Sequence, residues 1–234
     1  IRAEMAQAMP GRKLRIWGRG VDTGLFNPRR RDLAWRRALG FRDEEIVVLF
    51  FGRLVAEKGV GMFVEVARAL RMRDLPVRFL VVGEGPARPA FAPLGDVVLT
   101  GHLAGEELAR AVASADVFFN PSLTEAFGNV VLEAMASGVP VVAADVPSAA
   151  SLVRNGEEGL LCRPDRADYA SALTRLIRLP ALRKSLAATA LAASSLFSWD
   201  AASAEAFGAY QAALDRAPAE SSEMMVSRAV AKPR

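Results

Sequence analysis

Residues 46–52 read Ile-Val-Val-Leu-Phe-Phe-Gly, a run of β-branched and aromatic side chains that ends in a glycine. Short apolar runs with little polar alternation are typical of strands that are buried on both faces of a sheet. Similar runs follow at residues 77–82, 97–100, 116–120 and 141–144. The sequence therefore predicts five buried strands.

The segments between these runs have the periodicity of helices. Apolar residues between 63 and 70 recur at the i, i+3, i+4, i+7 spacing, and similar patterns occupy residues 108–112 and 128–136. Strands that alternate with helices imply right-handed crossovers and a parallel, doubly wound sheet, so the predicted fold class is α/β and Rossmann-like. From residue 168 to 214 the pattern is helical without a strand, which predicts extra C-terminal helices.

The composition limits the class of protein. Of the 234 residues, 52% are hydrophobic and 24% are charged, which excludes a wholly disordered chain. We expect one domain over residues 14–215, a linker or partial N-terminal segment over 1–13, and a disordered tail over 216–234. No apolar run approaches the ~18 residues that a membrane span needs.

Cysteine and histidine usage indicates the setting and the absence of metal chemistry. The single cysteine, Cys162, excludes internal disulfides, and the single histidine, His102, leaves no Cys/His zinc cluster. We therefore expect a cytoplasmic protein without a metal site.

One basic cluster, Arg29-Arg30-Arg31 with Arg36 and Arg37, has two interpretations. It is either a solvated helix face or a patch that faces anionic lipid headgroups or nucleic acid. No aromatic residues are interleaved with these arginines, so we expect no nucleic-acid partner.

Ligands of doubly wound sheets bind beyond the carboxyl ends of the strands, so the loop after each strand is informative. Arg53 and Lys58 follow the first strand, and two cations on one loop can clamp a diphosphate, the arginine as a fork and the lysine as a point charge. The alternative is two unrelated surface cations. The loop is not a Walker loop, which would need Gly at 57 and Ser or Thr at 59.

The loop after the second strand reads Gly83-Glu84-Gly85-Pro86 and begins like a dinucleotide fingerprint. Residue 88 is an arginine where the third glycine of that fingerprint belongs. The alternative is a turn rich in Gly and Pro. The interrupted fingerprint argues against a hydride-transferring oxidoreductase.

The strongest signal follows the fourth strand, where residues 121–133 place two carboxylates eight residues apart. Glu125 would lie in the loop before a helix that begins near Gly128, and Glu133 would lie inside that helix. Free backbone N–H groups at the helix start, with the helix dipole behind them, suit a phosphate-bearing ligand. The alternative is a capping acid plus an unrelated surface glutamate.

Together these motifs resemble a known family. The pair Arg53 and Lys58, the Glu-x7-Glu spacing of residues 125–133, and the upstream segments Gly20-Val21-Asp22-Thr23 and Phe26-Asn27-Pro28 are similar to those of the retaining glycosyltransferases of family 4. The resemblance covers about residues 14–214. It implies the C-terminal, donor-binding half of a two-domain GT-B enzyme, whose N-terminal, acceptor-binding domain is missing from this chain.

The resemblance also implies roles by position. The donor diphosphate would be held by Arg53 and Lys58, the sugar hydroxyls by Glu125, and the ribose hydroxyls by Glu133. The remaining positions would bind the donor through backbone amides or line its base and ribose pocket: Phe127, Gly128 and Asn129 for the amides, and Gly83, Gly85, His102 and Leu103 for the pocket.

The implied reaction moves a hexose from a nucleotide diphosphate sugar, GDP-mannose or a UDP-sugar, to an acceptor hydroxyl with retention of configuration. No cofactor is expected, and a lipid acceptor would add peripheral contact with the inner membrane face. Alternatives are a nucleotide-sugar epimerase, a phosphorylase and a non-catalytic nucleotide-sugar-binding module. For the isolated chain we expect donor binding without turnover.

Overall fold

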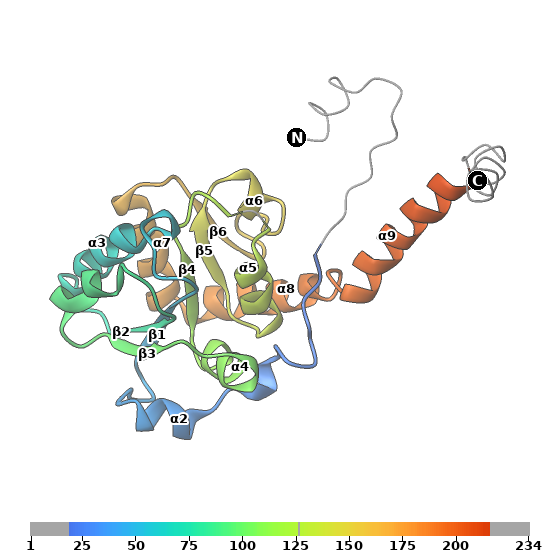
Figure 1. The fold of residues 1–234 in the computed structure, drawn as a ribbon. Helices are drawn as coiled ribbons and strands as arrows, with labels where there is room; N and C mark the ends of the chain where they lie inside the picture. Colours follow the sequence, from blue (N-terminus) through green and yellow to red (C-terminus); the bar gives the residue numbers. More distant parts are fainter. Residues whose placement is uncertain (1–18, 126, 216–234) are drawn as a thin grey trace, which may run out of the picture. The chain divides into compact units, whose positions relative to one another are not determined.

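Six parallel strands form one sheet in the order β3-β2-β1-β4-β5-β6 (Figure 1). The computed structural model describes residues 19–125 and 127–215. The order confirms the predicted doubly wound fold, and the two halves of the sheet meet between β1 and β4, where such folds bind ligands. The strands are β1 (Ile46–Phe51), β2 (Val77–Val82), β3 (Val98–Gly101), β4 (Val117–Asn120), β5 (Val141–Ala144) and β6 (Gly159–Cys162).

Sequence reasoning found β1 to β5 within one residue at either end and missed β6. This edge strand has four residues, and only three of them are apolar, so its pattern is too short to stand out. Its first residue has a packing reason to be glycine, because a Cβ on Gly159 would lie 2.4 Å from the Val141 carbonyl oxygen.

Helices cover both faces of the sheet. Figure 1 shows α3 and α7 together on one face and α4 and α5 on the other. The helical segments are η1 (Pro28–Arg30), α2 (Leu33–Ala38), η2 (Ala56–Lys58), α3 (Val60–Arg71), η3 (Arg88–Leu94), α4 (Gly105–Ala113), α5 (Asn129–Ala136), α6 (Pro147–Ala150), α7 (Arg166–Arg178), α8 (Pro180–Ser194) and α9 (Trp199–Leu214). The predicted helices at 63–70, 108–112 and 128–136 and the helical region after residue 168 are confirmed.

Residues 19–198 form one unit, and α9 belongs to a second. The sequence analysis placed all of 14–215 in one domain, so the structure draws the C-terminal boundary earlier, before Trp199. The linker and tail expected at 1–13 and 216–234 lie outside the described residues.

Strand β1 supplies side chains to both hydrophobic cores. Val48 and Phe50 belong to the core with α3 and α7, whereas Val47 and Leu49 belong to the core with α4 and α5. Fully burying such a side chain stabilises the fold by about 1.5–3 kcal/mol. The central strand that holds the two layers together is thus also the strand that presents the first loop of the candidate site.

Two arginines of the basic cluster are structural, and neither interpretation from the sequence fits them. Arg36 is 1% exposed and donates to the Ser114 carbonyl at 2.7 Å and to the Asp116 carboxylate at 2.8 Å. Arg31 reaches the other oxygen of Asp116 at 2.6 Å. Desolvation raises the pKa of Asp116, but the two arginines and the N–H of Val47 outweigh it, so this pKa lies below its ordinary value. Arg31 and Arg36 therefore anchor the segment of η1 and α2 to Asp116, which lies just before β4 and accepts from the Val47 N–H of β1.

Candidate functional site

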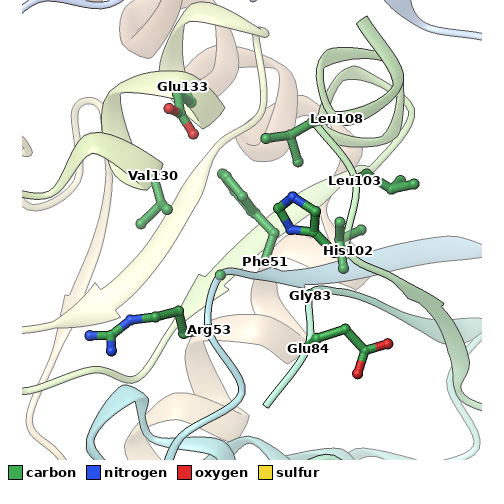
Figure 2. A pocket seen from close by; sticks show the side chains of 11 residues that line it. Phe51, Arg53, Gly83, Glu84, His102, Leu103, Leu108, Val130 and Glu133 are labelled. Carbon is green, nitrogen blue, oxygen red and sulfur yellow. The ribbon is translucent and has the colours of Figure 1, made fainter. Parts of the chain in front are cut away.

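A cavity of about 280 Å3 opens at the carboxyl ends of β1 and β2. Its walls come from the loops after β1, β2 and β3 and from helices α4 and α5 (Figure 2). Five residues that the sequence singled out line it: Arg53, Gly83, His102, Leu103 and Glu133. The cavity therefore lies beside the switch point of the sheet, as the fold predicts.

Glu133 is the distinctive group of this cavity. It is half-buried on α5, and Figure 2 shows its carboxylate directed into the space that Phe51, His102 and Leu108 border. Burial raises its pKa to about 7. Its carboxylate makes no hydrogen bond or ion pair with the residues that the structure describes. A carboxylate in this state is suited to accept hydrogen bonds from ligand hydroxyls.

Arg53 borders the same cavity from the loop after β1. Its guanidinium pairs with Glu57 at 3.0 Å, and the two side chains are 71% and 55% exposed. Figure 2 shows the Arg53 side chain extending away from Glu133. Exposed ion pairs of this kind contribute at most about 1 kcal/mol, so Arg53 can exchange Glu57 for a ligand phosphate at little cost.

Lys58 and Glu125 are brought together, but they do not line the cavity. The Lys58 ammonium at the end of η2 lies 2.8 Å from a Glu125 carboxylate oxygen, with the side chains 19% and 14% exposed. The structure thus divides the four predicted charged groups into two sets. Arg53 and Glu133 face the cavity, whereas Lys58 and Glu125 neutralise each other across the loops that follow β1 and β4.

The glycines after β2 have a packing role. A Cβ on Gly83 would lie 1.9 Å from the Gly52 carbonyl oxygen, and one on Gly85 would lie 2.3 Å from the Leu54 carbonyl oxygen. The two loops are also joined by the Leu54 N–H, which donates to the Glu84 carbonyl at 2.9 Å. Gly83 lines the cavity, but Gly85 does not. The glycine spacing that resembled a dinucleotide fingerprint lets two backbones pack in contact.

The start of α5 has the backbone that the sequence predicted. Gly128 has a φ of 67° and precedes the first helical residue, Asn129, so the first N–H groups of the helix have no acceptor within it. Phe127 is 52% exposed. None of these three residues lines the cavity, so an amide contact to a ligand there would lie outside it.

Comparisons with known proteins identify the family. The profile of the family described as glycosyl transferases group 1 matches residues 45–178. The chain belongs to this glycosyltransferase family. D-inositol 3-phosphate glycosyltransferase from Actinosynnema mirum is 37% identical over 214 residues, which cover 84% of this chain and 51% of the relative. GDP-mannose-dependent alpha-mannosyltransferase from Mycolicibacterium smegmatis is 39% identical over 203 residues, which cover 86% of this chain and 52% of the relative.

A solved structure agrees with this assignment. HepE from Anabaena in complex with UDP-glucose superposes with a TM-score of 0.70 at 26% identity, covering 82% of this chain and 56% of HepE. The glycosyltransferase chain described here spans about half the length of the curated relatives it matches.

Sequence reasoning missed several walls of the glycosyltransferase cavity. Phe51, Leu108 and Val130 line it, and only Phe51 had a signal, because it is the last residue of a predicted strand. Leu108 and Val130 are apolar residues of predicted helices, and nothing in their periodicity separates a cavity wall from a core position.

Neither a metal-binding cluster nor a membrane-spanning helix occurs in the part of the chain that the structure describes. Among residues 19–125 and 127–215, no group of three or more His, Cys, Asp or Glu side chains could hold a metal ion. Within the same part of the chain, none of the helices combines the length and apolarity that a bilayer span requires.

Proposed function

We propose that this chain is the C-terminal, donor-binding half of a retaining glycosyltransferase of family 4. The enzyme would move a hexose from a nucleotide diphosphate sugar to an acceptor hydroxyl. The observation that carries the proposal is the cavity in which the unpartnered carboxylate of Glu133 faces apolar walls, with Arg53 at its edge. The similarity to a GDP-mannose-dependent mannosyltransferase and to HepE in complex with UDP-glucose supports a GDP- or UDP-linked donor.

The donor would lie along the carboxyl edge of the sheet. Its nucleoside would occupy the cavity near His102 and Leu103, with the ribose hydroxyls donating to Glu133. Its diphosphate would lie between Arg53 and the first amides of α5, because a guanidinium and a helix N-terminus each suit a negatively charged group. The hexose would then reach Glu125.

Bond cleavage at the anomeric carbon leaves negative charge on the β-phosphate of the departing nucleotide. Arg53, Lys58 and the α5 amides would stabilise that charge, and one such donor is typically worth on the order of 3–4 kcal/mol of the barrier. Lys58 would leave its pair with Glu125 when the phosphate arrives, which would free Glu125 to accept from a sugar hydroxyl. Arg53 and Lys58 follow β1 and Glu125 follows β4, and the donor would lie between these two segments.

The acceptor would be bound by a further domain of the whole enzyme, since this chain spans about half the length of its curated relatives. We therefore expect the isolated chain to bind donor without transferring its sugar. A cytoplasmic enzyme with a lipid acceptor would contact the inner membrane face peripherally.

Calorimetric titration of the chain with GDP, UDP, GDP-mannose and UDP-glucose tests the proposal. We expect either GDP and GDP-mannose or UDP and UDP-glucose to bind. Glu133→Gln and Arg53→Met should each weaken the affinity for those two ligands about tenfold or more, as the loss of a charged hydrogen bond predicts. Glu107→Gln, at an exposed position on α4, is the matched control and should bind normally.

Two results would contradict the proposal. One is the absence of binding to all four ligands at millimolar concentration, and the other is normal affinity in both variants. An NMR spectrum of the sugar after incubation with the chain distinguishes donor binding from an epimerase, which would produce a second sugar.

A further inference from the structure

Arg19 lies against the loop that begins α5. Its guanidinium carbon is 4.1 Å from the centroid of the Phe127 ring, a cation–π contact. Arg19 makes no hydrogen bond or ion pair with any residue in the described ranges, so no competing contact within them explains its position. The stacking on Phe127 is therefore the contact that orients the Arg19 side chain.

The segment that carries Arg19 is firmly anchored. Val21 is 6% exposed, and its N–H donates to the Phe197 carbonyl at 2.8 Å. Asp22 accepts from the N–H groups of Gly24 and Leu25 at 2.9 and 3.0 Å, which fixes the following turn. Arg19 thus lies two residues before the anchored Val21, and its side chain can restrain the Phe127 ring that it contacts.

Phe127 belongs to the loop between β4 and α5, which also carries Glu125, the partner of Lys58. Towards β4, the Lys58–Glu125 pair and the Thr124 hydroxyl, which donates to the Glu57 carbonyl at 3.3 Å, tie the loop to η2. Towards α5, Phe127 is half exposed, and its ring is covered by Arg19. The loop is therefore held from both sides, by a lysine on one and by an arginine on the other.

We propose that Arg19 is a positioning residue for the hexose of the donor. By stacking on Phe127 it fixes, two residues earlier, the carboxylate of Glu125. The first turn of α5 is held separately by the Gly128 carbonyl, which accepts from the N–H groups of Val131 and Leu132 at 2.8 and 3.2 Å. The inference rests on the proposed function, because Glu125 matters for the sugar only if a nucleotide sugar is the ligand. It predicts that Arg19 affects recognition of the sugar and not of the nucleotide, since the nucleotide contacts Glu133 and the cavity.

The test compares the dissociation constants of a nucleoside diphosphate and its hexose conjugate, UDP with UDP-glucose and GDP with GDP-mannose, by calorimetry on the same chain. Arg19→Met and Phe127→Leu should each weaken the sugar conjugate about two- to fivefold, the range of an exposed cation–π contact. The dissociation constant of each variant for the nucleoside diphosphate should stay within a factor of about 1.5 of the wild-type value, which is roughly the reproducibility of calorimetry.

Three further variants sharpen the result. Arg19→Lys keeps a cation over the ring and should restore most of the sugar affinity. The double variant Arg19→Met/Phe127→Leu should lose no more than either single variant, because both remove the same contact. Arg30→Met is the control: this partly buried arginine pairs with the exposed Glu106, and its replacement should leave both affinities unchanged.

Each contrary outcome has a distinct meaning. Equal weakening of the nucleotide and its sugar conjugate would overturn the inference and would indicate that Arg19 binds phosphate directly. An unchanged sugar affinity, or additive losses in the double variant, would also overturn it while the proposed function stands. A wild-type chain that binds neither nucleotide overturns the proposed function and this inference together.

Discussion

The cavity carboxylate of Glu133 should make the stability of this protein fall as the pH rises. Its pKa is raised from 4.5 to about 7 by burial. Between these values the unfolded chain loses a proton that the folded chain keeps, so the free energy of unfolding decreases with pH until it levels off above 7. A shift of this size corresponds to up to about 3 kcal/mol, because one pKa unit is worth about 1.4 kcal/mol.

The Glu133→Gln variant removes this pH-dependent loss of stability, because an amide resembles the protonated acid and cannot ionise. Relative to the wild type it should be more stable by less than about 1 kcal/mol at pH 5 and by up to about 3 kcal/mol at pH 8. Urea unfolding followed by tryptophan fluorescence at pH 5, 6, 7 and 8 measures the difference. The exposed Glu107→Gln variant should show no such trend.

A difference between Glu133→Gln and the wild type that does not change with pH would refute this reasoning, as would a wild-type stability that rises from pH 5 to pH 8. The same variant is expected to bind donor more weakly at pH 8. A gain in stability together with a loss of binding would mark Glu133 as a residue kept for its ligand and not for the fold.

Two other substitutions test the framework of the site. Asp116→Asn leaves the buried guanidinium of Arg36 without its counter-charge, so we expect a loss of about 3–5 kcal/mol in urea unfolding at pH 7. Because the pKa of Asp116 is lowered in the folded state, that loss should shrink as the pH falls below 4. Gly83→Ala places a Cβ 1.9 Å from the Gly52 carbonyl oxygen and should cost more than about 3 kcal/mol or prevent folding. Gly40→Ala, where φ is also positive but no atom lies within 4 Å, isolates the conformational strain and should cost only about 1–2 kcal/mol.

The doubly wound sheet could be predicted because its strands β1, β2 and β4 are mostly apolar runs separated by helical patterns. In Ile46–Phe51 the five residues 47–51 are buried in one of two cores and Ile46 packs against one of them, as expected for a strand covered on both faces. The edge strand Gly159–Cys162 could not be found in this way, since its identity depends on pairing with β5 and not on its own pattern.

The site could be predicted only in part. Arg53 and Glu133 were identified because charges that follow a strand, or interrupt an apolar helix, stand out locally. The pairing of Lys58 with Glu125 depends on how two loops 67 residues apart meet, and the sequence does not encode that meeting locally. The burial of Arg36 is of the same kind: a run of arginines predicts charge, whereas the partner Asp116 lies 80 residues away.

The contact between the loops after β1 and β2 divides the cavity into a fixed and an adjustable part. Where Gly52 meets Gly83 the floor is bare backbone, and a side chain on Gly83 has no room because its Cβ would lie 1.9 Å from the Gly52 carbonyl oxygen. The opposite walls are formed by the side chains of His102, Leu108 and Val130. If the cavity binds a nucleotide as proposed, a change of preference between a purine and a pyrimidine would therefore arise at these positions or at other lining side chains such as Phe51 and Leu103, where a substitution alters the shape of the cavity while the backbone beneath it stays in place.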